Sequence, residues 1–313
     1  MLAAALLAGC GGDGGERTFT NPVHAENFPD PFLLRADDTW YAYATNDADG
    51  NVQTLTSQDL VTWAKGPDAL PQLGSWATPG DTWAPEVLEL DDSYVLYYTA
   101  RGAEQGVQCI GRAVADAPEG PFRDTAARPL ICDRAEGGDI DASPFRDDDG
   151  SLYLLWKNDG NSIGEDTWIY AQRLTADGLG LTGKRARLVK QDARWEGPVV
   201  EAPTLWREDG SYYLFYSANI FDSGIYAVGY ATCGGPLGPC RDAPENPILK
   251  GACEASGPGH QTVVRDGDGD TWLVYHAYPA SGEDQRELWL DRLDWKDGKP
   301  VVNGPTCRAQ PAP

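Results

Sequence analysis

Three carboxylates and one histidine stand at a nearly constant distance before an aromatic segment of the chain. They are Asp30, Asp141, Glu201 and His260, which precede Trp40, Tyr153, Tyr213 and Trp272 by 10, 12, 12 and 12 residues. Carboxyl groups gathered in one cleft cannot all ionise freely, so their pKa values are driven apart. One acid kept protonated and one base kept ionised near neutral pH are what the cleavage of a glycosidic bond requires. We therefore predict that Asp30, Asp141 and Glu201 are catalytic.

The alternative interpretation is that Asp30 and Asp141 merely cap strands. It does not explain why each follows an apolar or proline residue and precedes an apolar segment, as in Phe28-Pro29-Asp30-Pro31. Acyl transfer through a serine nucleophile is not supported, because the chain has no Gly-x-Ser-x-Gly motif and only three histidines.

The elements that must position these residues repeat along the chain. A turn rich in Asp and Gly followed by an aromatic strand occurs five times, at 37–43, 91–97, 149–156, 209–216 and 268–275. The aligned aromatic residues are spaced by 54, 59, 60 and 59 residues. A fixed period of this size indicates a solenoid, a propeller or an array, and each period has room for about four strands, which form one propeller blade. We predict an all-β, five-bladed β-propeller.

Composition agrees with an all-β chain and limits the choice of partners. The 313 residues include 36 Gly, 23 Pro, 11 Trp and 14 Tyr, which favours many short strands and turns. The formal net charge of −23 is unsuited to nucleic acid or an anionic membrane and fits a neutral ligand better. Because blades share a radial geometry, the four polar residues are expected to converge at one mouth of the central channel. We expect a monomer.

The first residues suggest export. Leu6-Leu7-Ala8-Gly9-Cys10 resembles a bacterial lipobox, and a glycine-rich stretch that could act as a tether follows it. The alternatives are a fragment of an ordinary signal peptide or a buried strand. We divide the chain into a lipoprotein-type signal and tether at 1–17 and one propeller domain at 18–313. Contact with a membrane is expected only through a lipid on Cys10, in a periplasmic or cell-surface lipoprotein.

The cysteines fit this compartment. If Cys10 carries lipid, six cysteines remain, an even number that suits three disulfides in an exported protein. Sequence alone allows 15 pairings of six cysteines. Proximity and the repeat pattern favour the pairs Cys109–Cys132, Cys233–Cys240 and Cys253–Cys307. The absence of a Cys-x-x-Cys pair argues against a structural zinc site.

From these motifs, the chain resembles glycoside hydrolase family 43, five-bladed propellers that cleave arabinofuranosides and xylosides with inversion. The resemblance implies that Asp30, in its Pro-Asp-Pro motif, is the general base. It implies that Glu201, followed by Ala-Pro, is the general acid, and that Asp141 raises the pKa of that acid and orients it. Inversion places the acid and the base about 6.5–9.5 Å apart, which leaves room for a water molecule.

The resemblance also suggests residues with supporting roles. A His in a Gly-His motif touches a hydrated calcium ion in some members, which corresponds to His260, although calcium prefers oxygen ligands. His276 and His24 are interpreted as a structural residue and a loop residue. Arg286 matches an arginine that binds sugar hydroxyls; the alternative is an exposed hairpin arginine. Trp83 could stack on a sugar ring.

Several substrates remain open. Xylosidases of the family usually carry a further β-sandwich, for which the printed sequence has no counterpart, so an exo-acting α-L-arabinofuranosidase is our first choice. An endo-arabinanase follows, and a β-xylosidase comes next. The fructan hydrolase signatures are absent, since Glu201 precedes Ala202 and not Cys. A lectin would need the aromatic residues but not the complete carboxylate set.

Overall fold

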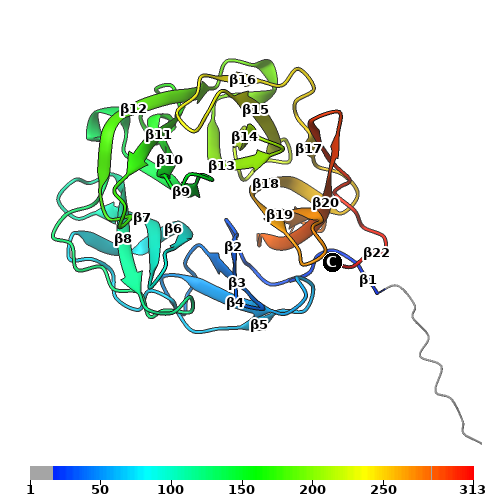
Figure 1. Ribbon diagram of the computed structural model, residues 1–313, viewed down its shortest axis with the longest axis horizontal. Coiled ribbons are helices and arrows are strands. Elements are labelled where there is room, and N and C mark those ends of the chain that lie inside the picture. Colours follow the sequence, from blue (N-terminus) through cyan, green and yellow to red (C-terminus); the bar gives the residue numbers. More distant parts are fainter. Residues whose placement is uncertain (1–16, 283) are drawn as a thin grey trace, which may run out of the picture.

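Five β-sheets surround a central axis in the computed structural model, which describes residues 17–282 and 284–313 (Figure 1). The helical content of these residues is confined to short 3-10 turns, and none of their helices is long and apolar enough to cross a membrane. The prediction of an all-β, five-bladed propeller is confirmed. The expected lipid anchor on Cys10 and nearly all of the expected tether lie outside the described residues.

Each blade is an antiparallel sheet whose strands follow one another in the chain. The first two blades contain β2 (Phe32–Ala36), β3 (Thr39–Ala44), β4 (Gln53–Ser57), β5 (Ala64–Lys65), β6 (Ala77–Glu89), β7 (Tyr94–Gly102) and β8 (Gln108–Ala115). The third contains β9 (Asp139–Arg146), β10 (Leu152–Asn158), β11 (Trp168–Leu174) and β12 (Leu181–Lys190). The last two contain β13 (Val200–Glu208), β14 (Ser211–Ala218), β15 (Ala227–Cys233), β16 (Cys240–Asp242), β17 (Leu249–Lys250), β18 (Ala255–Arg265), β19 (Thr271–Pro279), β20 (Glu287–Lys296) and β21 (Lys299–Val302).

The first strands of the blades, β2, β6, β9, β13 and β18, contact one another around the axis. The residues that precede the Asp/Gly turns lie in these strands, as the sequence predicts, except that Asp30 lies just before β2. The second blade has three strands in its sheet instead of four, and the fourth has five.

The repeated turns are tight hairpins where glycine allows them. Glu208 pairs with Ser211, so only Asp209 and Gly210 connect β13 to β14. Both turn residues have positive φ, at 46° and 77°. A two-residue turn of this kind matches the twist of the flanking strands, and glycine adopts the left-handed conformation at little cost.

The core lies between neighbouring blades. One buried cluster joins Leu33 and Trp40 of the first blade to Trp272, Val274 and Leu290 of the last. The same kind of packing recurs between the other neighbouring blades. The aromatic residues of the repeat therefore pack one blade against the next, and this packing fixes where the inner strands lie.

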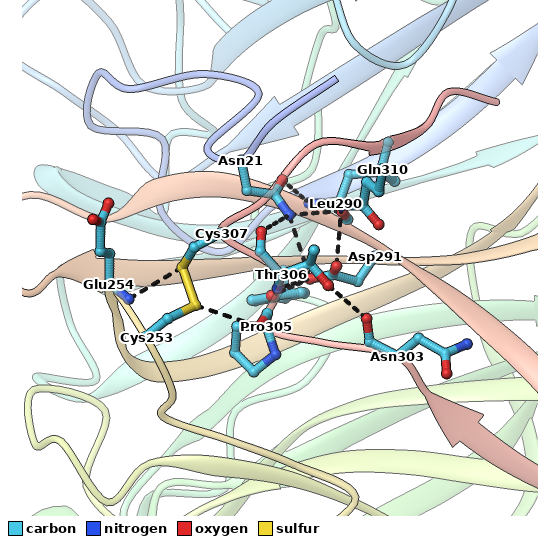
Figure 2. Close-up of a disulfide and its surroundings, with 11 residues drawn as sticks. Asn21, Cys253, Glu254, Leu290, Asp291, Asn303, Pro305, Thr306, Cys307 and Gln310 are labelled. Carbon is cyan, nitrogen blue, oxygen red and sulfur yellow. Dashed lines mark hydrogen bonds between the residues drawn. A yellow bond between two sulfur atoms is a disulfide. The ribbon is translucent and has the colours of Figure 1, made fainter. Parts of the chain in front are cut away.

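The ring closes where the two ends of the described chain meet. β1 (Thr18–Phe19) pairs with β22 (Gln310–Pro311), and both lie beside the last blade (Figure 1). The side chain of Asn21 donates to the carbonyl of Leu290 at 2.9 Å and accepts from the Leu290 N–H at 2.9 Å (Figure 2). The segment after β1 is thus hydrogen-bonded to β20 of the last blade.

A disulfide fastens the C-terminal segment next to this closure. Cys253, just before β18, bonds to Cys307 across 54 residues of sequence (Figure 2). The other bonds join Cys109 to Cys132 and Cys233 to Cys240. All three predicted pairs are confirmed, and three disulfides are typical of an exported protein.

Candidate active site

One non-glycine residue within or just before each inner strand has a left-handed backbone. These residues and their φ values are Asp30 (57°), Ala84 (45°), Asp141 (57°), Ala202 (52°) and His260 (50°). Positive φ is unfavourable for residues with a side chain, so its occurrence once at each inner strand marks the same position in all five blades. Asp30, Asp141 and His260 are therefore equivalent, as the sequence predicts.

The placement of Glu201 at this same position is wrong by one residue. Glu201 pairs with Ser217, as Ile140 pairs with Lys157 and Gly259 with His276. Glu201 therefore corresponds to the residue before the left-handed one, and in the second blade this residue is Trp83. Glu201 thus enters the site from a different strand position than the two aspartates.

Each left-handed residue is hydrogen-bonded to the preceding blade. We call this set of hydrogen bonds around the channel the inner belt. In each bond a backbone N–H of one blade donates to a side chain of the preceding blade. The bonds run from Asp30 to His276 Nδ1 (3.1 Å), Ala84 to Thr45 Oγ1 (3.0 Å), Asp141 to Thr99 Oγ1 (3.3 Å), Ala202 to Asp141 Oδ2 (2.9 Å) and His260 to Ser217 Oγ (2.8 Å).

The third blade departs from the pattern. By register, Lys157 stands where the other blades place Thr45, Thr99, Ser217 or His276. An ammonium group has no acceptor, so the N–H of Ala202 bonds to the Asp141 carboxylate instead. Because Asp141 accepts this hydrogen bond in place of residue 157, Lys157 can contact Glu201. The same bond holds the Asp141 carboxylate in a fixed orientation.

All six predicted site residues line one cavity of about 370 Å³. They are Asp30, Trp83, Asp141, Glu201, His260 and Arg286. The cavity is also lined by Thr45, Ile140, Lys157, Asp159, Asn161, Ser162 and Phe221. Convergence of residues from all five blades into one cavity agrees with the radial geometry expected from the repeats.

Asp30 is surrounded by cationic and hydrogen-bonding groups. Its Oδ1 lies 2.7 Å from Arg286 Nη1 and 3.2 Å from His260 Nδ1, and its Oδ2 accepts from Thr45 Oγ1 at 2.5 Å. Burial opposes ionisation, but Arg286, the two nearby histidines and Thr45 outweigh it and hold the pKa of Asp30 well below its usual range. Asp30 is an ionised carboxylate at neutral pH, as a base must be.

Asp141 has the opposite electrostatic environment. Burial raises its pKa to about 6, with a further rise from Glu201 and opposing effects from His260 and Lys157. The two buried aspartates of equivalent position thus titrate in different pH ranges, because one faces Arg286 and the other faces a second carboxyl group. This separation is the pattern expected of acid–base machinery.

Both oxygens of Glu201 have a partner. Its Oε1 accepts from the hydroxyl of Tyr226 at 2.8 Å, and its Oε2 lies 3.2 Å from Lys157 Nζ. Lys157 is fully buried and also donates to Asn161 Oδ1 at 2.7 Å. These contacts aim the carboxyl group of Glu201 into the cavity.

Sequence reasoning missed Lys157, Tyr226 and Phe221. Lys157 interrupts the apolar strand Leu-Tyr-Leu-Leu-Trp-Lys, and this interruption is a signal that could have been used. Tyr226 resembles the many other aromatic residues, so no local signal separates it from the core. His276 is buried, as interpreted from the sequence, but its ring also accepts the N–H of Asp30.

The side chains of Arg286 and His260 both contact Asp30. Arg286 is not an exposed hairpin arginine, since its side chain is 16% exposed and pairs with Asp30. Within residues 17–282 and 284–313, no group of three or more His, Cys, Asp or Glu side chains is arranged to hold a metal ion. One imidazole whose Nδ1 faces Asp30 is a poor match for the oxygen-rich coordination of calcium.

The arrangement can perform acid–base chemistry on a neutral ligand. It offers an ionised carboxylate, a carboxyl group held between a lysine and a tyrosine, and an indole and a phenyl ring at the cavity wall. Trp83 and Phe221 supply apolar surface against which a sugar ring can pack.

Known proteins are similar to this chain in sequence, and a solved structure is similar to it in fold. The family model for glycosyl hydrolases family 43 matches residues 19–300. The crystal structure of a thermostable family-43 glycoside hydrolase is 34% identical, with a TM-score of 0.86, over 94% of this chain and 99% of that one. Beta-D-galactofuranosidase xynD of Aspergillus niger is 26% identical over 90% of this chain and 84% of its own length. A non-reducing end alpha-L-arabinofuranosidase, BoGH43B of Bacteroides ovatus, is 28% identical over 92% of this chain, which spans 54% of that protein.

Proposed function

The chain belongs to glycosyl hydrolases family 43 and is a glycoside hydrolase, and from this premise we propose that it is an exo-acting α-L-arabinofuranosidase. Its proposed substrates are the arabinose units of arabinan or arabinoxylan. The proposal rests on three carboxyl groups that converge in one cavity: an ionised Asp30, an Asp141 whose pKa is raised to about 6, and Glu201.

In the proposed mechanism Asp30 accepts a proton from a water molecule that attacks the anomeric carbon. Glu201 donates a proton to the glycosidic oxygen as the bond breaks, so the configuration is inverted. Asp141 is a negative neighbour that keeps the proton on Glu201 until it is needed. Arg286 holds Asp30 Oδ1 at 2.7 Å and orients the base.

The exo preference is supported by the size of the site. A cavity of about 370 Å³ is at the small end of ligand sites and suits one glycosyl unit better than a long bound chain. Two of the relatives named above are furanosidases, which agrees with a furanose in the cavity. Endo-arabinanase and β-xylosidase activity remain the alternatives, and a non-catalytic glycan-binding propeller is the third.

Two further proposals concern features outside the catalytic carboxylates. We propose that the protein is exported and anchored by a lipid on Cys10, which labelling with a radioactive fatty acid would detect and Cys10→Ser would abolish. We also propose that a calcium ion binds beside His260, with water molecules as its remaining ligands. Metal analysis of the dialysed protein would find one equivalent if the proposal is right and none if it is wrong.

The function is tested by product analysis. Soluble protein that begins after Cys10 would be incubated with arabinan, arabinoxylan and xylan. Arabinose alone supports the proposal, whereas arabino-oligosaccharides or xylose would assign the endo-arabinanase or the xylosidase. Glu201→Ala should reduce turnover by about 10²–10⁴-fold, and an active variant would remove Glu201 from the acid role. The first product formed should have inverted configuration, and retention would refute Asp30 as the water-activating base.

A further inference from the structure

A fully buried lysine lies beside the proposed acid. The side chain of Lys157, in β10, has no exposed surface, and its Nζ lies 2.7 Å from Asn161 Oδ1, 3.2 Å from Glu201 Oε2 and 3.7 Å from Asp159 Oδ1. An ammonium group has three N–H donors, so each of them can face one of these oxygens. Lysine is almost never fully buried unless it is paired, and an apolar residue would cost less free energy to bury here. The proposed mechanism gives this ammonium group no part.

The second contact of Glu201 is with a neutral group. Its Oε1 accepts from the hydroxyl of Tyr226 at 2.8 Å. Burial, Glu201 and Asp141 raise the pKa of Tyr226 well above 10, so this hydroxyl is an uncharged donor near neutral pH. Charged groups face Glu201 from three neighbouring segments: Asp141 from β9, Lys157 from β10, and Asp159 from the turn that follows β10. Of these three, Lys157 is the cation.

The charge of Glu201 changes during the proposed reaction. Its carboxyl group gives a proton to the glycosidic oxygen while the bond from that oxygen to the anomeric carbon breaks, and a water oxygen bonds to that carbon as its proton passes to Asp30. Glu201 is then a carboxylate in a largely buried place, where an unpaired negative charge is costly. The nearby ammonium group favours this carboxylate, whereas Asp141 and Asp159 oppose it.

We propose that Lys157 is a positioning residue of the reaction, which stabilises the carboxylate left on Glu201 when the proton departs. A charge that is already in place where the opposite charge develops lowers the barrier of a reaction. Asn161 holds the ammonium group in this place. Because an ammonium group donates but cannot accept, a proton on Glu201 Oε2 can pass to a ligand but not to Lys157. This inference rests on the proposed function, in which Glu201 is the acid.

A role of this kind makes the effect of the lysine depend on the leaving group. A sugar hydroxyl needs the proton of Glu201 to depart, whereas 4-nitrophenolate departs with little protonation. Lys157→Met keeps a long unbranched side chain and removes the charge. We expect it to lower kcat for arabinose release from arabinan oligosaccharides about 10²-fold. The same variant should lower kcat for 4-nitrophenyl α-L-arabinofuranoside by less than about threefold.

The pH–rate profile separates the charge of Lys157 from its packing. Removal of a cation beside the acid should move the alkaline limb of kcat/KM to higher pH by about one unit, because the carboxyl group then keeps its proton more readily. Lys157→Gln, which is neutral but can still donate to Asn161, should move the limb in the same direction and replaces Lys157→Met if that variant does not fold. Lys184→Met makes the same change at an exposed lysine of β12 and is the control. Equal losses on both substrates with the limb in place would show a packing role and overturn the inference.

A measurement without turnover separates this inference from the proposed function. Carbon-13 NMR of protein labelled at its glutamate carboxyl carbons follows the ionisation of Glu201, whose resonance is identified by its absence in Glu201→Gln. We expect the titration of this resonance to move to higher pH in Lys157→Gln and to stay in place in Lys184→Met. That result, without arabinose release by the wild type from any substrate, would contradict the proposed function and keep the effect of Lys157 on Glu201. An unchanged titration in Lys157→Gln would overturn the inference even if the wild type releases arabinose.

Discussion

The carboxyl group of Asp141 is engaged from two directions. Its Oδ2 accepts the N–H of Ala202, the residue after Glu201, and its charge interacts with Glu201 itself. Burial and this like-charge neighbour raise its pKa to about 6. Asp141 is therefore ionised above about pH 6, in the range where a protonated acid is hardest to maintain.

We predict that Asp141→Asn moves the alkaline limb of the pH–rate profile of kcat/KM to lower pH by about one unit. The amide removes a negative charge beside the acid, which then loses its proton more readily. Asp148→Asn, which changes an exposed carboxyl in the same hairpin, serves as the control. A limb that stays in place would mean that Asp141 does not tune Glu201.

Glu86 is a buried carboxyl in the inner strand β6. Burial raises its pKa well above 4.5, with a further rise from Asp141 and an opposing effect from a hydrogen bond with Ser143. A raised pKa means that the folded state binds more protons than the unfolded state above pH 4.5. The contribution of Glu86 to stability is therefore present below that pH and is lost as the pH rises.

We predict that Glu86→Gln raises Tm at pH 7 and changes it little at pH 4. The amide is neutral at both pH values, so it removes the proton uptake that folding requires at pH 7. Thermal unfolding of both proteins across this range measures the effect. If the increase in Tm caused by Glu86→Gln does not grow with pH, Glu86 is ionised in the folded protein.

The carboxylates that line the cavity could be predicted because their neighbours are distinctive: Asp30 lies between two prolines and Glu201 precedes Ala-Pro. Lys157 and Tyr226 could not be assigned to Glu201, because their contacts reach β13 from β10 and from the residue just before β15. Such contacts depend on the register of strands, which residue types alone do not define.

At the scale of the elements, hairpin length explains the one-residue error in placing Glu201. Tyr153 pairs with Phe145, eight residues earlier, whereas Tyr213 pairs with Trp206, seven residues earlier. Counting back the same number of residues from the aromatic therefore reaches Asp141 in one blade and the residue before its equivalent in the other. The period of the repeats predicts the blades, but the length of each turn decides which side chain faces the cavity.

The inner belt is expected to contribute to stability as well as position. Ser217 accepts the N–H of His260 at 2.8 Å and donates to Gln261 Oε1 at 2.9 Å, with no exposed surface. We predict that Ser217→Ala costs about 1–3 kcal/mol, because it leaves a buried N–H without an acceptor. Urea unfolding measures this cost, with Ser211→Ala at the exposed start of β14 as the control. A cost below the control would show that water replaces the hydroxyl.

At the scale of the whole molecule, five blades could be predicted because the aromatic spacing is nearly constant. The closure could not, because β1 and β22 are two residues each and carry no repeat. The pairing of their ends becomes apparent only when the ring is complete.

The disulfides should differ in their effect on the whole molecule. Cys253–Cys307 spans 54 residues and Cys233–Cys240 spans 7. Loop-closure entropy predicts losses of about 4 and about 2.5 kcal/mol when each pair is changed to serine. Denaturant unfolding of the two double variants would rank them, and the reverse order would mean that strand pairing, and not chain entropy, dominates.

The bond between Asp30 and His276 joins the first blade to the last and crosses the seam of the ring. Asp30, the proposed base, is thus positioned by a contact that exists only when the ring is closed. Because Arg17 and Ala312 are joined by a 2.8 Å backbone hydrogen bond, the ends of the described residues 17–313 lie close enough to be joined by circular permutation. New ends placed between two other blades would move the seam away from the base. In the natural chain order, by contrast, a break at the seam removes the hydrogen bond between Asp30 and His276 before the other blades need come apart.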